Sequence, residues 1–198
     1  MNTNAQRAVI LVLLLSLMAA TRSYLLYHFA PVPDASWAVF FIAGFYLRGW
    51  SKWAFPLFMA VAVGADYVAI REQGIDFWSH YCVSPGYWFL VPAYLSLWLG
   101  GNLARRAYSP AQPGKSLAAA VAALVAGVVL CHLFAQGGFY WLSDSVPQTA
   151  TMAGWWKNYS DWLLPYLRTA AIYTGLAVIT HAGVQQVARL VKVQRKSA

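Results

Sequence analysis

The chain has 198 residues, of which 60% are hydrophobic and only 10% are charged, and its formal net charge is +8. A mean hydropathy of +0.51 with so few charges excludes a water-soluble globule, because soluble domains carry about 25% charged residues. The length corresponds to one domain, which we assign to 1–198.

Long apolar runs recur along the chain, and each is close to the ~20 residues that cross a hydrocarbon core about 30 Å thick. Backbone groups in lipid must be paired within the spanning structure, and the runs lack the alternating polarity of barrel strands. We therefore predict one all-α membrane domain with six transmembrane helices, at 8–27, 35–48, 53–71, 87–104, 117–136 and 163–188.

The two N-terminal helices are the least regular of the six. Arg7, the apolar run after it and Met18-Ala19-Ala20 resemble a secretory signal with a small-residue cleavage site. The apolar run resumes at 24–27, so we predict a retained first helix. The second helix, at about 14 residues, is short for a span, and an extension into Gly49 and Trp50 would lengthen it.

Basic residues concentrate on one side of the predicted bundle. With six spans, the N-terminus, the 48–53 turn, the 105–116 loop and the C-terminus share that side. Lys and Arg favour the cytoplasmic side, so we expect both termini in the cytoplasm. The net charge then reflects topology and anionic lipid, not nucleic-acid binding. Ten of the 14 cations lie there: Arg7, Arg48, Lys52, Arg105, Arg106, Lys115, Arg189, Lys192, Arg195 and Lys196.

The connections on the opposite side, 28–34, 72–86 and 137–162, are long and rich in His, Asp, Trp and Tyr. An outward-facing cup with aromatic walls suits a sizeable, partly apolar ligand. An aromatic girdle at the headgroup level would explain the Trp and Tyr residues, but it would not explain the histidines and the thiol. These connections contain Cys82, His28, His80, Trp78, Tyr140, Trp141, Trp155, Trp156, Tyr159 and Trp162.

Cys82 lies in a polar loop at 77–87, between the third and fourth predicted helices. A thiol in such a loop can be a soft-metal ligand, a nucleophile or a redox partner, or simply a half-buried small residue. A disulfide with Cys131, near the outer end of the fifth helix, is also open. So is a zinc site with His80, although two ligands alone are a weak signal.

Three charged residues fall inside predicted spans, all at a similar depth beneath the outer loops: Arg22, Asp66 and Arg168. A charge in hydrocarbon costs about 2.5–3.5 kcal/mol on insertion scales, so such residues usually pair or face a polar cavity. A structural pair between Asp66 and an arginine, a polar cavity, or both together would satisfy them.

Motifs of energy coupling and hydrolysis are absent from the sequence. Pro113-Gly114-Lys115-Ser116 imitates the end of a phosphate-binding loop, but Ser109 stands where that motif needs its first glycine. Without a nucleotide site the chain cannot use ATP alone. No Gly-x-Ser-x-Gly, His-Glu-x-x-His or Cys-x-x-Cys motif occurs.

A six-helix membrane protein with no energy-supplying domain and an outward ligand cup resembles the S-components of energy-coupling factor (ECF) vitamin transporters. Within this group, the segment 80–88 points to one family; it reads His-Tyr-Cys-Val-Ser-Pro-Gly-Tyr-Trp. Together with Asp66 in the third helix and His28 after the first, it looks like the BtuM family of small bacterial vitamin B12 transporters. The resemblance covers the whole chain in topology and is specific in residue detail around Cys82.

The resemblance implies a multi-pass protein of the bacterial inner (cytoplasmic) membrane that binds cobalamin on its extracytoplasmic side. Cys82 would coordinate the cobalt and displace the dimethylbenzimidazole of the vitamin, so that cobalamin binds base-off. Tyr81, Tyr87 and the loop tryptophans would pack on the macrocycle, and Asp66 and His28 would hydrogen-bond its amides. The expected binding residues are Cys82, His28, Asp66, Tyr81, Tyr87 and His80.

Thiolate donation to cobalt should weaken the ligand on the opposite face of the corrin. We therefore expect Cys82 to promote loss of cyanide from cyanocobalamin, which would add a chemical activity to a transporter.

One feature departs from the S-component pattern. S-components that share an energising module commonly carry Ala-x-x-x-Ala in the first helix, whereas this chain has Ser16-x-x-x-Ala20. This difference favours a solitary transporter. Two alternatives stay open: a membrane thiol enzyme that uses Cys82 with His80 or His28 as base, and an S-component for another vitamin.

Overall fold

The computed structural model describes residues 3–22, 32–143 and 150–197, and every regular element in these ranges is a helix. The α-helices are α1 (Asn4–Arg22), α2 (Ser36–Tyr46), α3 (Ser51–Glu72), α4 (Leu90–Ala107), α5 (Pro113–Leu142) and α6 (Met152–Ser197). Short 3-10 helices are η1 (Arg48–Trp50), which precedes α3, and η2 (Phe77–Ser79) and η3 (Pro85–Phe89), which lie between α3 and α4. The predicted all-α fold is confirmed.

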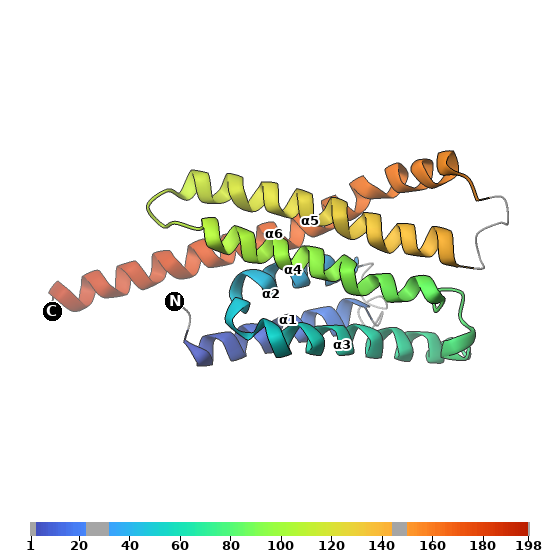
Figure 1. Cartoon of the computed structure of the whole chain (residues 1–198). Helices are drawn as coiled ribbons and strands as arrows, with labels where there is room; N and C mark the ends of the chain where they lie inside the picture. The colour runs from blue at the N-terminus through green and yellow to red at the C-terminus, as the bar shows by residue number, and fades with distance from the viewer. Residues whose placement is uncertain (1–2, 23–31, 144–149, 198) are drawn as a thin grey trace.

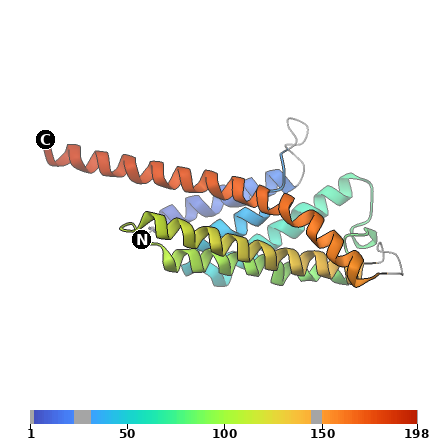
Figure 2. The ribbon, with the colours of Figure 1, turned by 90° about the horizontal axis from the view of Figure 1, so that it is seen from above.

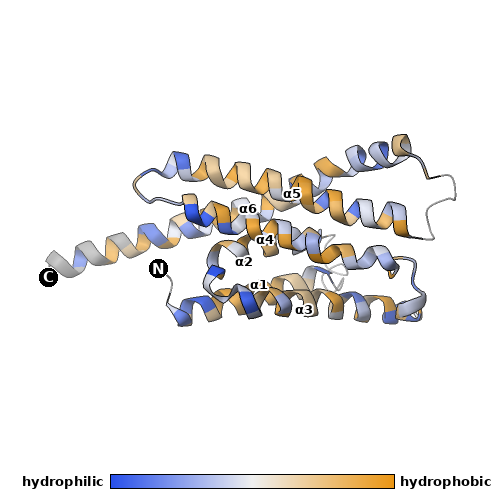
Figure 3. Cartoon of the chain, in the orientation of Figure 1, coloured by the Kyte–Doolittle hydropathy of each residue, from blue (hydrophilic) through white to orange (hydrophobic). Residues whose placement is uncertain are grey.

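Four segments of the described chain are long and apolar enough to cross a membrane: Asn4–Arg22, Arg48–Glu72, Pro113–Leu142 and Met152–Ala188. α2 is apolar but has only 11 residues, and α4 ends in the basic pair Arg105 and Arg106. Apolar residues run along the helices, and polar ones gather toward their ends (Figure 3). These features support a multi-pass membrane protein.

The helices have two distinct ends. The start of α1, the turn between α4 and α5 and the end of α6 lie together, and α6 continues past the other helices there (Figures 1 and 2). We call this the basic end, because Arg7, Arg105, Arg106 and Lys115 belong to these segments. The connection from α3 to α4, with η2 and η3, lies at the opposite end, which we call the loop end.

α2 is the central helix of the bundle. All of its residues except Phe45 and Tyr46 are buried, as expected for a helix that is apolar on every side. Two glycines allow close contact with α4: a Cβ on Gly44 would collide with the backbone of Trp98, and a Cβ on Gly101 would collide with the backbone of Phe41. Small residues at such contacts are typical of helix packing in membranes.

The predicted ends of α5 and α6 were wrong. α5 continues beyond 136 to Leu142, and α6 begins at Met152, so much of the predicted 137–162 loop is helical. Hydropathy shows only where a helix is apolar. The helical backbone hydrogen bonds continue beyond those limits, through Gly137 and Gly138 in α5 and through the aromatic first turns of α6. The first helix, predicted at 8–27, is helical from Asn4 to Arg22, and 23–27 lies outside the described residues.

Candidate functional site

A cavity of about 880 Å³ lies where the ends of α1, α3 and α5 meet the α3–α4 connection. Five of the six predicted binding residues line it: Asp66, His80, Tyr81, Cys82 and Tyr87. His28, the sixth, falls in 23–31, outside the described residues. Other lining residues are Thr21, Arg22, Asp34, Ile70, Gln73, Phe139 and Tyr166. The volume is in the upper part of the range for ligand pockets.

The segment that carries Cys82 begins with a glycine cap on α3. Gly74 has a φ of +73°, and its N–H donates to the carbonyl of Arg71 at 2.9 Å, as is usual where a helix ends. Asp76 then caps η2 by accepting from the N–H of Trp78 at 3.0 Å and of Ser79 at 3.2 Å. These contacts turn the chain back across the loop end.

Cys82 follows in a tight turn. Its backbone N–H donates to Nδ1 of His80 at 3.2 Å, and the N–H of Val83 donates to the carbonyl of His80 at 2.8 Å. The hydroxyl of Ser143 donates to the carbonyl of Tyr81 at 3.2 Å and connects the turn to the end of α5. The side chain of Cys82 is half-buried and lines the cavity.

η3 then packs on α5 through two glycines. A Cβ on Gly86 would collide with the carbonyl of Gly138. A Cβ on Gly138 would lie 2.6 Å from Cβ of Phe89. Since no side chain fits between the two backbones, this contact sets the position of the segment that presents Cys82 and Tyr87.

Arg22, at the end of α1, lines the cavity and contacts α3, α4 and the residues just before α2. Its Nε and Nη2 donate to the two carboxylate oxygens of Asp66 at 2.7 and 2.8 Å, which is the bidentate geometry of strong arginine–carboxylate pairs. Its Nη1 donates to the hydroxyl of Tyr94 at 2.7 Å and to Asp34 at 3.1 Å. The hydroxyl of Tyr87 donates to Asp66 at 2.7 Å. Both expected roles of Asp66 occur together: it pairs with an arginine and it lines the cavity.

Arg168 does not join this cluster. It is exposed on α6, does not line the cavity, and forms no ion pair with any described residue. Arg168 was predicted at the same depth as Arg22 and Asp66, but it does not lie beside them. The helix end expected near Arg168 is absent, because α6 begins at Met152, and the arginine lies on an exposed face well inside this helix.

Cys82 and Cys131 are both free thiols. Cys131 is fully buried in the core of the bundle, so the disulfide interpretation is wrong. Burial raises the pKa of Cys82, the negative charge of Asp66 raises it further, and a hydrogen bond with Tyr81 acts in the opposite direction. Cys82 is therefore a neutral thiol at neutral pH.

The zinc interpretation finds no further support. In the described part of the chain, no three His, Cys, Asp or Glu side chains are grouped closely enough to hold a metal ion. His80 and Cys82 thus stay two ligands without a second pair.

The aromatic part of the cavity wall consists of three tyrosines and Phe139, whereas loop tryptophans were expected beside Tyr81 and Tyr87. No tryptophan is among its described lining residues, and Trp78, Trp88 and Trp156 are more than half exposed. Tyr166 of α6 lines the cavity instead and stacks on Trp37 with ring centroids 4.5 Å apart. Tyr166, Asp34 and Tyr94 were not predicted, because nothing in their local sequence pattern connects them to the 77–87 segment.

No protein-family model matches the chain, and no curated protein matches it. The fold and the site therefore define the class: an all-α, multi-pass membrane protein with a large polar and aromatic cavity at one end, and with a free cysteine among the lining residues.

Proposed function

We propose that this protein is a solitary cobalamin transporter of the S-component type, in which the Cys82 thiolate is an axial ligand of cobalt. The observation that carries the proposal is the position of Cys82: its thiol lines a large cavity at the loop end, beside four of the other residues expected to bind the vitamin. A thiolate is a soft, polarizable donor that suits a transition metal in a planar macrocycle.

The surroundings of Cys82 suit a ligand with an apolar face and polar edges. Tyr81, Phe139 and Tyr166 supply rings, while Asp66, Gln73 and His80 supply hydrogen-bonding groups that match amide side chains. Asp66 is less available to the ligand than the other two, because Arg22 already donates to both of its carboxylate oxygens and Tyr87 donates to Oδ2. It would therefore position Arg22 and Tyr87 more than bind the ligand itself.

The proposal includes six spans with both termini in the cytoplasm. In this topology α2 and α4 are the two shorter spans, and the basic end is cytoplasmic, as the distribution of Lys and Arg favours. The loop end and the cavity then face outward in the inner membrane of a bacterium. Transport would proceed by reorientation of the bundle, downhill and drawn by intracellular use, because the sequence carries no nucleotide-binding motif.

The same ligation would promote loss of cyanide from cyanocobalamin. Cys82 gives up its thiol proton and forms the Co–S bond. The Co–C bond on the opposite face breaks heterolytically, and cyanide leaves with the electron pair and takes up a proton as HCN. Cobalt stays Co(III), and water enters the vacated position. No oxidant or reductant is consumed.

The raised pKa of Cys82 does not favour the alternative of a thiol enzyme, because reactive cysteines are usually thiolates with a lowered pKa.

The decisive experiment is an absorbance spectrum of the detergent-purified protein from cells grown with cobalamin, beside Cys82→Ala and the control Cys131→Ala. We expect a base-off, thiolate-shifted corrinoid spectrum in the wild type and in Cys131→Ala, and its change or loss in Cys82→Ala. A wild-type protein that stays colourless even with added cobalamin would refute the proposal. An S-component for another vitamin would instead bind a small organic ligand tightly, and this binding would survive Cys82→Ala.

The cyanide step has its own test. Release of cyanide from bound cyanocobalamin is followed by the change in the corrin spectrum, in the wild type and in Cys82→Ala. The hypothesis fails if the variant binds cyanocobalamin and loses cyanide at the wild-type rate.

A further inference from the structure

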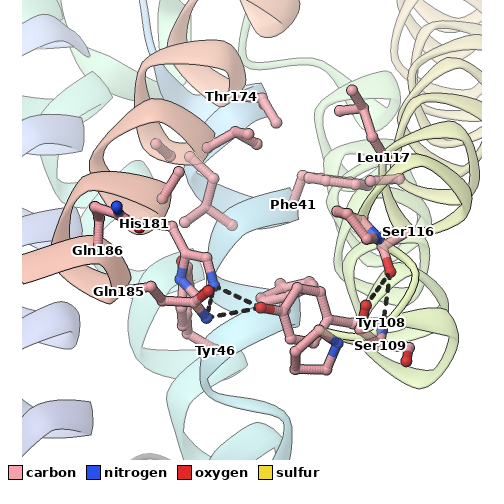
Figure 4. A pocket seen from close by; sticks show the side chains of 18 residues that line it. Phe41, Tyr46, Tyr108, Ser109, Ser116, Leu117, Thr174, His181, Gln185 and Gln186 are labelled. Atoms are coloured by element: carbon pink, nitrogen blue, oxygen red, sulfur yellow. Dashed lines mark hydrogen bonds between the residues drawn. The ribbon is translucent and has the colours of Figure 1, made fainter. Parts of the chain in front are cut away.

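A second cavity, of about 450 Å³, lies toward the basic end between α2, the α4–α5 turn, α5 and α6. Thr174, Phe41 and Leu117 lie at one end of it, and Tyr46, Tyr108 and Ser109 lie at the other (Figure 4). Ile42, Ala120, Ala177 and Val178 make most of the remaining wall apolar. It shares no lining residue with the cavity beside Cys82.

A closed hydrogen-bond network forms the polar end of this cavity (Figure 4). Nε2 of Gln185 donates to the hydroxyl of Tyr108 at 2.7 Å and lies 2.9 Å from Nε2 of His181. The hydroxyl of Tyr108 lies 3.1 Å from the same ring nitrogen, and the hydroxyl of Tyr46 lies 2.8 Å from Nδ1. With the imidazole protonated at Nδ1, Nδ1–H donates to Tyr46, and the single lone pair of Nε2 is shared between the Tyr108 hydroxyl and the Gln185 amide. These side chains therefore bond to one another without a ligand.

Arg105 supplies the positive charge next to this network. Its guanidinium carbon lies 5.3 Å from the ring centroids of both Phe45 and Tyr108, two residues that line the cavity. Arg105 is only partly exposed, yet among the described residues no carboxylate lies within ion-pair distance of it. No side chain caps the N-terminus of α5 at Gln112. The first turn of this helix lines the cavity through Pro113 and Ser116, so the partial positive charge of that helix end acts at the same cavity.

The dimensions of the cavity match one lipid leaflet. Its lining residues on α6 extend from Thr174 to Gln186, which at the rise of an α-helix spans roughly 18 Å. Half of a hydrocarbon core is about 15 Å thick. The cavity as a whole therefore has about the length of one leaflet. Its apolar part on α6, from Thr174 to Val178, covers roughly 6 Å of that length, enough for part of an acyl chain, and the polar end with His181 and Gln185 lies on the side of Arg105.

We propose that this cavity binds one anionic phospholipid, with an acyl chain in the apolar slot and the phosphate at Arg105. Basic pockets between transmembrane helices on the cytoplasmic side are known to hold anionic headgroups. The proposal is independent of cobalamin, since it concerns a different cavity at the other end of the bundle.

The test is native mass spectrometry of the full chain in mild detergent, with phosphatidylglycerol or phosphatidylcholine of identical chains added in equal amounts. We expect the wild type to retain phosphatidylglycerol roughly fivefold better, the effect of one well-placed cation. Arg105→Gln should abolish the preference, whereas Arg106→Gln, an exposed neighbour, should keep it. Ala120→Phe fills the slot and should reduce retention of both lipids, while Ala122→Phe, on the exposed side of α5, should not.

Three results would overturn the proposal: equal retention of the two lipids by the wild type, an equal effect of Arg105→Gln and Arg106→Gln, or displacement of the lipid by glycerol 3-phosphate. The last would identify a site for a small soluble anion. If Ala120→Phe fails to fold, judged by its melting temperature, the arginine pair still decides, because Arg105→Gln fills no space.

Discussion

Gly86 of η3 and Gly138 of α5 meet backbone to backbone beside the cavity, and neither has room for a Cβ. This contact, more than any bond made by Cys82 itself, determines where the thiol lies. The position of Cys82, the proposed cobalt ligand, thus depends on two glycines that take no part in the proposed chemistry.

The first prediction follows from this contact. Gly138→Ala should destabilise the protein by about 1–3 kcal/mol, because a methyl group must be forced into a closely packed contact, and should weaken cobalamin binding by displacing η3. A thermal melt and a cobalamin titration measure the two effects.

Gly137→Ala is the matched control for this substitution. A Cβ at Gly137 would meet only Nε1 of Trp155, at an ordinary 3.8 Å, so stability and binding should be close to wild type. If both alanine variants behave alike, the glycine contact does not position the Cys82 segment.

The second prediction concerns the Arg22–Asp66 pair, whose side chains are 12% and 19% exposed. Asp66→Asn should cost about 2–3 kcal/mol of unfolding free energy. Removing one partner of a buried pair typically costs about 3–5 kcal/mol, and here Asp34 still contacts Arg22 at 3.1 Å. Chemical denaturation in detergent measures the change.

Asp161→Asn provides the comparison, because it breaks the Lys157–Asp161 pair, whose side chains are 77% and 52% exposed. Its effect should stay below about 1 kcal/mol. Equal losses in the two variants would mean that the Arg22 cluster is not a structural centre of the bundle.

The third prediction concerns the packing of α2 against α4. Gly44→Ala should strongly destabilise the bundle, because its Cβ would collide with the backbone of Trp98. Gly64→Ala in α3 has no atom within 4 Å of the added Cβ, so it should be neutral or stabilise by up to about 1 kcal/mol through helix propensity. Melting temperatures of the two variants give the comparison, and a Gly44→Ala variant as stable as Gly64→Ala would contradict the close approach.

A helix was predictable from the sequence where the length of an apolar run determines its bounds. It was less predictable where contacts between distant segments are involved. The third helix, expected at 53–71 and found at Ser51–Glu72, is bounded on both sides by polar or turn-forming residues that local patterns identify. The last turns of α5, by contrast, pack against η3 through Gly138. This is a contact between segments about 50 residues apart, and hydropathy carries no information about it.

The candidate site divides in the same way. Cys82 and Asp66 were singled out by their residue types and Tyr87 by the family resemblance, and the structure brings all three to one cavity. Tyr94 was not predicted, because an aromatic residue inside an apolar helix is normally a core residue. Only the three-dimensional structure shows that its hydroxyl lies 2.7 Å from Nη1 of Arg22. The partners of a buried charge come from separate helices and have no common sequence signal.

The fourth prediction is a pH dependence of cobalamin binding. Burial and Asp66 raise the pKa of Cys82, so the free protein carries a protonated thiol at neutral pH, whereas a cobalt ligand must be a thiolate. Binding then releases one proton, and affinity should increase with pH by about tenfold per unit below the pKa of the thiol. Titrations between about pH 6 and about pH 8 would measure the slope, together with proton release into a weakly buffered solution.

Cys82→Ala is the control for this effect. Any residual binding by the variant should release no thiol proton and should lose the tenfold-per-unit slope, because no thiol is left to ionise. A wild-type affinity that stays constant, or that falls as the pH rises, would show that Cys82 does not bind as a thiolate. The cavity would then have to recognise its ligand through its tyrosines and polar groups alone.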